Sequence, residues 1–212
     1  MDTARQIARR LLEAGAVKLQ PKRPFTWASG LRSPIYCDNR VLLSFPEIRR
    51  EVLAAMGAAA GAVPGVEGVA GVATAGIPHG ALLADRLGLP FVYVRSKAKA
   101  HGRQNQIEGR LEAGHRYLVV EDLVSTGGSS LKAVDALRAA GAEVVGAVAI
   151  FSYAFPAAAR AFEQAEVPLT ALSNYPTLLE EAEATNYITP AEAVALSNWR
   201  NDPRAWSEAF EA

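Results

Sequence analysis

The segment Tyr117-Leu-Val-Val-Glu-Asp-Leu-Val-Ser-Thr-Gly-Gly-Ser-Ser-Leu131 joins an apolar run to a loop of small, hydroxyl-bearing residues. Its first part, residues 117–120, is short and apolar, which is typical of a strand buried on both faces of a parallel sheet. Two adjacent acids, Glu121 and Asp122, follow the strand, and the loop Ser125-Thr-Gly-Gly-Ser129 comes next. Apolar residues then recur at helical spacing until a glycine ends the pattern. The segment therefore predicts a strand, an acidic pair, a loop and a helix, in that order.

This order of elements predicts a binding site for a phosphorylated sugar. Backbone N–H groups and the positive end of the helix dipole attract a phosphate, and glycine lets the backbone approach it closely. The two acids repel phosphate, but they suit the hydroxyls of a sugar or the waters around Mg²⁺. A tight turn with a helix N-cap has a similar composition. The acidic pair beside the apolar strand favours the ligand site. The loop lacks the Gly-Lys-Ser/Thr of a Walker loop and the GxGxxG of a dinucleotide site.

The rest of the chain alternates predicted strands and helices. Strands are predicted at about 66–72, 90–95, 143–151 and 169–172, and helices at about 44–60, 79–87 and 156–164. This alternation predicts a doubly wound α/β core with a mainly parallel sheet flanked by helices. A helix over 4–14 and short strands between residues 17 and 37 precede the core and predict a small N-terminal hood.

We expect one domain over residues 1–212. The hood falls mainly within about 1–40, the α/β core within about 44–175, and further helices within about 176–212. One of these helices begins at Thr189-Pro-Ala-Glu192, which has the pattern of a capping box.

Composition excludes several classes of protein. Lys and Arg together number 22, as do Asp and Glu, so bulk charge gives no support for nucleic-acid binding. A single cysteine, Cys37, excludes an intramolecular disulfide and suits a reducing cytoplasm. No apolar stretch reaches the roughly 18 residues of a membrane span, and the charged N-terminus does not resemble a signal peptide. We therefore expect a cytoplasmic protein that binds neither nucleic acid nor membrane.

The segment 96–110 interrupts the alternation. It is polar, contains two glycines and has a single acid, Glu108. Against this acid it carries four Lys and Arg residues and one histidine: Lys97, Lys99, His101, Arg103 and Arg110. A long loop in a compact domain is usually a lid or disordered, and a charged loop is most often merely solvated. This loop leaves the end of a predicted strand, where ligands bind in α/β sheets. A cationic lid there would screen the charge of a phosphorylated ligand and exclude water.

Val119-Val-Glu-Asp-Leu-Val-Ser-Thr-Gly-Gly-Ser129 resembles the phosphoribosyl-pyrophosphate (PRPP) motif of type I phosphoribosyltransferases. Three further segments are similar to those of the orotate phosphoribosyltransferase family. Residues 25–40 resemble its hood, Thr74-Ala-Gly-Ile-Pro-His79 its pyrophosphate-side loop, and residues 95–109 its catalytic loop. The hood and the Arg-x-x-x-Lys-x-His-Gly loop distinguish this family from other phosphoribosyltransferases.

The resemblance implies a reaction and its partners. Orotate and PRPP would give orotidine 5′-monophosphate and pyrophosphate, with Mg²⁺, in de novo pyrimidine (UMP) synthesis. It also implies a homodimer in which the catalytic loop reaches into the neighbouring subunit's site. Mg²⁺ would be carried by PRPP without a direct protein ligand, with its waters near Glu121 and Asp122.

The resemblance assigns roles to individual residues. Catalysis is implied for Lys99, His101 and Asp122, and orotate binding for Ser125, with Arg32 and Arg40 as candidates for its carboxylate. PRPP binding is implied for the residues that match the motif and the two loops: Thr74, Ala75, Arg95, Lys97, Lys99, His101, Glu121, Asp122, Leu123, Val124, Ser125, Thr126, Gly127, Gly128 and Ser129.

Some members of the family differ from this chain at four positions. Ala28, Ala75 and Ser96 stand where those members carry lysine, and Tyr153 stands where they carry an orotate-binding arginine. Lys97 is a candidate to replace one lost cation. These departures concern the orotate side of the site more than the PRPP side.

Two alternative functions remain. One is a phosphoribosyltransferase for another base, such as a purine, which the hood sequence disfavours. The other is a PRPP-sensing regulator without catalysis. Such a regulator should carry a helix-turn-helix or a basic face, and the sequence indicates neither.

Overall fold

The structure is a computed structural model that describes residues 2–27, 29–96 and 106–211, excluding the side chains of residues 210 and 211. Its internal contacts divide the chain into two compact units. One comprises residues 1–48 and 173–212, and the other residues 49–172. Within the described ranges, no helix has the length and apolar character needed to cross a membrane.

A six-stranded sheet organises residues 49–172. Its strand order is β10-β9-β8-β5-β6-β7. The four strands β6, β5, β8 and β9 pair in parallel, and β7 pairs antiparallel with β6 at one edge. The strand bounds are β5 (Gly68–Val72), β6 (Phe91–Val94), β7 (Ile107–Glu108), β8 (Arg116–Val124), β9 (Glu143–Ser152) and β10 (Leu169–Asn174). The predicted mainly parallel α/β sheet is confirmed.

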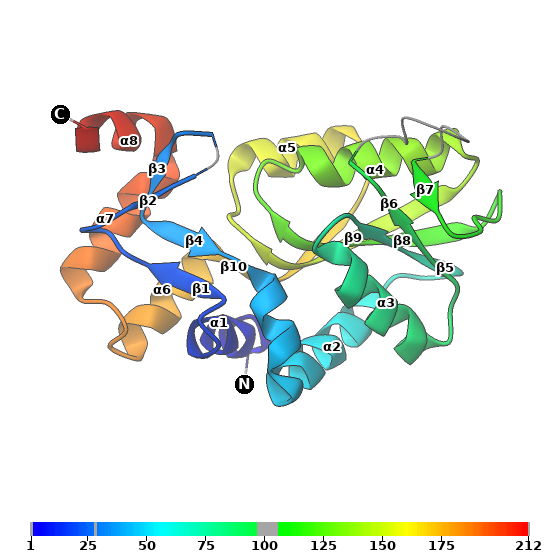
Figure 1. Ribbon diagram of the computed structural model, residues 1–212, viewed down its shortest axis with the longest axis horizontal. Helices are drawn as coiled ribbons and strands as arrows, with labels where there is room; N and C mark the ends of the chain where they lie inside the picture. The colour runs from blue at the N-terminus through cyan, green and yellow to red at the C-terminus, as the bar shows by residue number, and fades with distance from the viewer. Residues whose placement is uncertain (1, 28, 97–105, 212) are drawn as a thin grey trace. The chain divides into compact units, whose positions relative to one another are not determined.

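Helices cover both faces of this sheet, with α3 and α4 on opposite sides (Figure 1). The helix bounds are α2 (Pro46–Gly61), α3 (Gly76–Leu87), α4 (Gly128–Ala139) and α5 (Pro156–Gln164). The chain runs outward from β5 to β6 and then returns past β5 to β8, so the winding direction reverses between β5 and β8. In sheets of this kind, ligands bind at the carboxyl ends of the strands beside such a reversal.

The strand predicted at residues 117–120 is fully buried. The side chains of Tyr117, Leu118, Val119 and Val120 are each 0% exposed, because β8 lies between β5 and β9 and has helices over both faces. Burial on both faces explains why this part of the strand is continuously apolar. The run therefore marks the centre of the sheet, as its sequence predicts.

Three predicted boundaries were wrong. The β8 strand continues to Val124, because β9 supplies a parallel partner for Glu121, Leu123 and Val124. The acidic pair therefore belongs to the strand. Helix α3 begins at Gly76 rather than near His79. The segment expected as one continuous loop over 96–110 contains β7, which β6 pairs with through the backbone.

The second unit joins the two ends of the chain. Two antiparallel pairs, β1 with β4 and β2 with β3, lie between α1 and the C-terminal helices in the sequence. The element bounds are α1 (Thr3–Glu13), β1 (Val17–Leu19), β2 (Phe25–Thr26), β3 (Arg32–Ser33), β4 (Ile35–Cys37), the 3₁₀ helix η1 (Asn39–Ser44), α6 (Tyr175–Ala184), α7 (Pro190–Asn201) and α8 (Pro203–Glu211).

Hydrogen bonds connect the first helix of this unit to its last segments. Arg9 Nε donates to the buried Glu181 Oε1 over 2.7 Å, and Ser173 Oγ donates to the Ala4 carbonyl over 2.8 Å. The predicted capping box at α7 is confirmed, since Thr189 and Glu192 bond to each other's backbone N–H groups. Because these groups lie in separate parts of the sequence, the unit forms only when both ends of the chain meet.

We predict that Gly76→Ala destabilises the protein. A Cβ at residue 76 would lie 2.5 Å from the carbonyl oxygen of Val120 in β8, so α3 or β8 must shift. Overpacking of this kind typically costs about 1–3 kcal/mol. A lower midpoint of urea unfolding than that of the wild type is the expected result. Gly61→Ala is the matched control, because a Cβ there meets nothing within 4 Å. Equal midpoints for the two variants would contradict the prediction.

Candidate functional site

The predicted site residues of the sheet unit lie at the carboxyl ends of β5, β6 and β8. Thr74 and Ala75 connect β5 to α3, and the Ala73–Thr74 peptide bond is cis. Arg95 follows β6 directly, and residues 125–127 connect β8 to α4. Because these strands run parallel, the three connections lie together at the carboxyl ends of the strands. The winding of the sheet reverses here, so this is the expected ligand side.

The connection after β8 forms a cavity of about 270 Å³. It is lined by Leu123, Ser125, Thr126, Gly127, Gly128, Ser129, Ser130 and Lys132. Gly127 is the N-cap of α4 and has a φ of +85°, a conformation that favours glycine. A Cβ at Gly128 would meet no other atom closer than 4.0 Å. The wall is thus built from hydroxyls and the backbone at the start of a helix, which together suit a phosphate.

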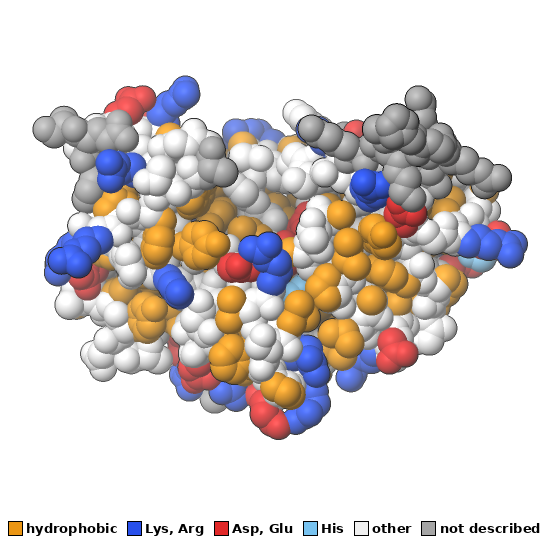
Figure 2. Space-filling model, in the orientation of Figure 1, with side chains coloured by type: hydrophobic (Ala, Val, Ile, Leu, Met, Phe, Trp, Pro, Cys, Tyr) orange, Lys and Arg blue, Asp and Glu red, His pale blue; other side chains and the backbone are white. Residues whose placement is uncertain are grey.

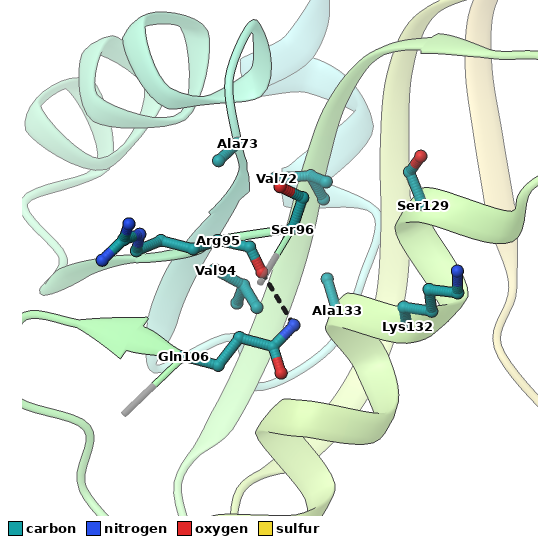
Figure 3. A pocket seen from close by; sticks show the side chains of 9 residues that line it. All are labelled: Val72, Ala73, Val94, Arg95, Ser96, Gln106, Ser129, Lys132 and Ala133. Carbon is teal, nitrogen blue, oxygen red and sulfur yellow. Dashed lines mark hydrogen bonds between the residues drawn. The ribbon is translucent and has the colours of Figure 1, made fainter. Parts of the chain in front are cut away.

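A second cavity, of about 100 Å³, lies between the strand ends and α4 (Figure 3). Its lining comprises Val72, Ala73, Val94, Arg95, Ser96, Gln106, Ser129, Lys132 and Ala133. Gln106 Nε2 donates to the Arg95 carbonyl over 2.7 Å, and this bond ties the end of β6 to the start of the β7 segment. The Arg95 guanidinium points away from α4 in Figure 3 and pairs with Glu108 over 3.4 Å. Ser129 and Lys132 line both cavities.

The acidic pair is held from two sides. The Glu121 side chain is buried, and its Oε2 accepts a hydrogen bond from Ser130 Oγ over 3.0 Å. Its Oε1 accepts the backbone N–H of Asp122 over 3.2 Å. Burial, and then the neighbouring charge of Asp122, raises the pKa of Glu121 to about 8. Asp122 is partly exposed, so the two acids differ in their access to solvent.

The two acids at this site can be compared with the ligands that Mg²⁺ prefers. This ion keeps several waters and usually takes one or two carboxylates together with substrate phosphates. Among the described residues, no group of three or more His, Cys, Asp or Glu side chains could enclose a metal. The partly exposed Asp122 and the nearby Glu121 could contact a hydrated ion that arrives with a phosphorylated ligand. Their chemistry thus fits a hydrated Mg²⁺ ion.

The structure brings only part of the predicted site together. Residues 125–129 form one cavity, and Arg95 shares the second cavity with Ser129. Arg32 and Arg40 belong to the other compact unit, where Arg40 forms an ion pair with Asp38 over 2.6 Å and lowers the pKa of that carboxyl. Lys97, Lys99 and His101 lie outside the described residues, as does Ala28.

The Tyr153 side chain is surrounded by other aromatic side chains, as is typical of a core residue. It is buried, and its ring packs against Phe151 edge-on at 5.9 Å and against Phe155 at 5.5 Å between centroids. Its backbone N–H donates to the Val124 carbonyl over 3.0 Å. The residue therefore contributes to the packing that holds β8 and β9 together beyond the acidic pair.

Sequence reasoning missed three residues at this edge: Ser130, Lys132 and Gln106. Ser130 and Lys132 follow the motif directly, and Lys132 is three residues after Ser129. Residues at that spacing in a helix share a face, so the helical periodicity contained this signal. Gln106 had no such signal, because its role depends on the pairing of β7 with β6.

We predict that Glu121 makes the stability of the protein depend on pH. Its pKa is about 8 in the folded state, against an ordinary value of 4.5 that applies to the unfolded chain. The folded state therefore favours the protonated form, and this contribution is complete below pH 4.5 and is lost as pH rises towards 8. The free energy of urea unfolding of the wild type should fall across this window relative to that of Glu121→Gln. Parallel pH profiles for the two proteins would refute the assignment.

Comparison with known proteins identifies the family of this chain. Residues 67–168 match the family model for the phosphoribosyl transferase domain. These residues include the acidic pair, both cavities and the connections after β5, β6 and β8.

Two curated relatives and one solved structure extend the match over nearly the whole chain. An orotate phosphoribosyltransferase of Bacteroides fragilis is 52% identical over 95% of this chain and 96% of its own length. The enzyme of the same name from Enterococcus faecalis is 49% identical over 97% of this chain and 98% of its own length. The crystal structure of orotate phosphoribosyltransferase from Aeropyrum pernix has a TM-score of 0.75 and 32% identity, and the match covers 86% of this chain and 99% of that one. With the motif, the sheet and the site in agreement, the chain belongs to the orotate phosphoribosyltransferase family.

Proposed function

We propose that the protein transfers the 5-phosphoribosyl group of PRPP to orotate, giving orotidine 5′-monophosphate and pyrophosphate. The observation that carries this proposal is the cavity formed by the loop of residues 125–129 beside the acidic pair of β8, in a chain that is 52% identical to an orotate phosphoribosyltransferase. The reaction is a step of UMP synthesis.

The chemistry requires positioning and electrostatic stabilisation more than a strong base. Displacement at C1′ of the ribose builds oxocarbenium character on the sugar and negative charge on the departing pyrophosphate. Anionic orotate is already a competent nucleophile at N1. The protein must therefore hold two anions in reacting geometry and stabilise the charge of the leaving group.

The described residues divide this work between two elements. The 5′-phosphate would bind in the loop of residues 125–129, where backbone N–H groups and hydroxyls line the cavity. Glu121 and Asp122 would bind the ribose hydroxyls from the end of β8. Mg²⁺, when PRPP carries it, offsets the charge of the pyrophosphate, and its waters would contact the same two acids.

The remaining roles rest on the resemblance of the motifs. Thr74, Ala75, Arg95 and Lys97 would face the pyrophosphate, and Lys99 and His101 would assist its departure. Orotate would contact Ser125, with Arg32 or Arg40 at its carboxylate. The single cysteine, Cys37, agrees with a cytoplasmic location.

A homodimer is part of the proposal. The catalytic loop of each subunit would enter the site of the other. Figure 2 shows hydrophobic side chains gathered over α3, and Ile77, Ala81 and Leu82 of this helix are only half buried. Such a surface could be covered by a second copy of the chain. Sedimentation equilibrium of the purified protein would test this, and a monomer at assay concentrations would refute it.

The substrate is tested by one spectrophotometric assay. With orotate, PRPP and Mg²⁺ together, the absorbance of orotate should fall, and the fall should stop when Mg²⁺ is removed by a chelator. Adenine, guanine and uracil should give no product in place of orotate. Product from one of these bases and none from orotate would assign the protein to a different phosphoribosyltransferase. PRPP binding without transfer to any base would instead indicate a regulator.

Lys99→Ala should lower kcat severely, by about 100-fold or more, because a cation that stabilises the leaving group acts mainly in the transition state. PRPP should still bind, since residues 125–129 and the two acids are unchanged. Steady-state kinetics and equilibrium titration with PRPP measure the two effects separately. Lys18→Ala is the control: it removes an exposed lysine from β1, outside the proposed site. Near-wild-type turnover of Lys99→Ala would remove Lys99 from the mechanism.

A further inference from the structure

Ser130 occupies an unusual place among the hydroxyl residues around the loop. It is the third residue of α4, and its side chain is 2% exposed, whereas Ser129 and Thr126 are exposed. It also borders the loop cavity. The hydroxyl therefore lies under the phosphate loop, on the side that faces the sheet.

The hydrogen bond from Ser130 joins two elements that bind different parts of the ligand. Its Oγ donates to Glu121 Oε2 over 3.0 Å, across nine positions of sequence. Ser130 belongs to the helix whose first turn closes the loop, and Glu121 belongs to the strand that precedes the loop. The side-chain contact thus closes a ring around residues 122–129.

The hydrogen bond from Ser130 matters chiefly for the orientation of the Glu121 side chain. A buried carboxyl group costs free energy unless its oxygens have hydrogen-bond partners, and those partners fix its orientation. The backbone N–H of Asp122 serves Oε1, and the Ser130 hydroxyl serves Oε2. Without the hydroxyl, the side chain of Glu121 can turn about its own bonds while the backbone of β8 stays paired with β9. Loss of the Ser130 hydroxyl should therefore change the orientation of the Glu121 side chain more than it changes the fold.

We propose that Ser130 is a positioning residue that holds Glu121 in the orientation that binds the ribose hydroxyls, and so couples ribose binding to the phosphate loop. This inference rests on the proposed function. Ser130 touches no substrate atom in this scheme. It acts through Glu121, so its removal should affect recognition of the sugar and leave recognition of the phosphate intact.

A double-mutant cycle tests the coupling with two simple probes. Dissociation constants for ribose 5-phosphate and for inorganic phosphate are measured by calorimetry on the wild type, Ser130→Ala, Glu121→Ala and the double variant. Ser130→Ala should weaken ribose 5-phosphate binding about tenfold, which is the usual size of the contribution of one hydrogen bond. Inorganic phosphate should bind within twofold of the wild type. In the Glu121→Ala background, Ser130→Ala should have no further effect, because its only route to the sugar is gone.

Two further variants separate positioning from general stability. Ser130→Thr keeps the hydroxyl and should restore most of the affinity for ribose 5-phosphate. Ser173→Ala removes another buried serine hydroxyl that donates a hydrogen bond, in this case to the Ala4 carbonyl over 2.8 Å. Ser173→Ala should lower the unfolding midpoint by about as much as Ser130→Ala does, without changing either dissociation constant.

The inference is overturned by three results. These are unchanged ribose 5-phosphate affinity in Ser130→Ala, an equal loss for inorganic phosphate, or an undiminished effect in the Glu121→Ala background. The cycle measures binding and needs no turnover, so it decides the role of Ser130 even if orotate is not the acceptor. The proposed function is decided separately, by the absorbance assay with orotate, PRPP and Mg²⁺.

Discussion

The close contact of α3 with the sheet is the constraint on which the candidate site depends. Three glycines make it possible: Gly71 in β5, and Gly76 and Gly80 in α3. A Cβ on any of them would lie 2.9 Å or less from another atom, including the carbonyl oxygens of Gly76 and Val120. The helix therefore begins against the backbone of β8 without a layer of side chains between them. This contact brings the connection after β5 beside the acidic pair that ends the buried part of β8.

The opposite face of the sheet is organised by side chains. Val134 and Leu137 of α4 are buried with Tyr117 and Val119 of β8 in one hydrophobic cluster. Such packing fixes the position of the helix against the strand, and the hydrogen bond from Ser130 then orients the Glu121 side chain. The loop of residues 125–127 is therefore held at both ends, by the pairing of β8 with β9 and by the packing of α4.

The centre of the sheet and the loop after β8 could be predicted from sequence, because both depend on local patterns. A buried strand is continuously apolar, and a phosphate loop is small and hydroxyl-rich. The extension of β8 to Val124 could not be predicted, since the partner that pairs with it is β9, more than 20 positions away. The contact of Arg9 with Glu181 spans 172 positions and leaves no local trace. Likewise, the sequence shows Ser130 as one more small residue directly after the motif, and only the fold reveals that its hydroxyl donates a hydrogen bond to the acid.

The raised pKa of Glu121 has a consequence for how ligand binding is measured. Burial and the charge of Asp122 favour the protonated form of this carboxyl near neutral pH. A ligand that requires the ionised form must expel that proton into the solution, where the buffer takes it up. The heat measured on binding then includes the ionisation enthalpy of the buffer, so titrations in Hepes and in Tris would report different enthalpies for the same contacts. The difference between them counts the protons that the site exchanges with its surroundings.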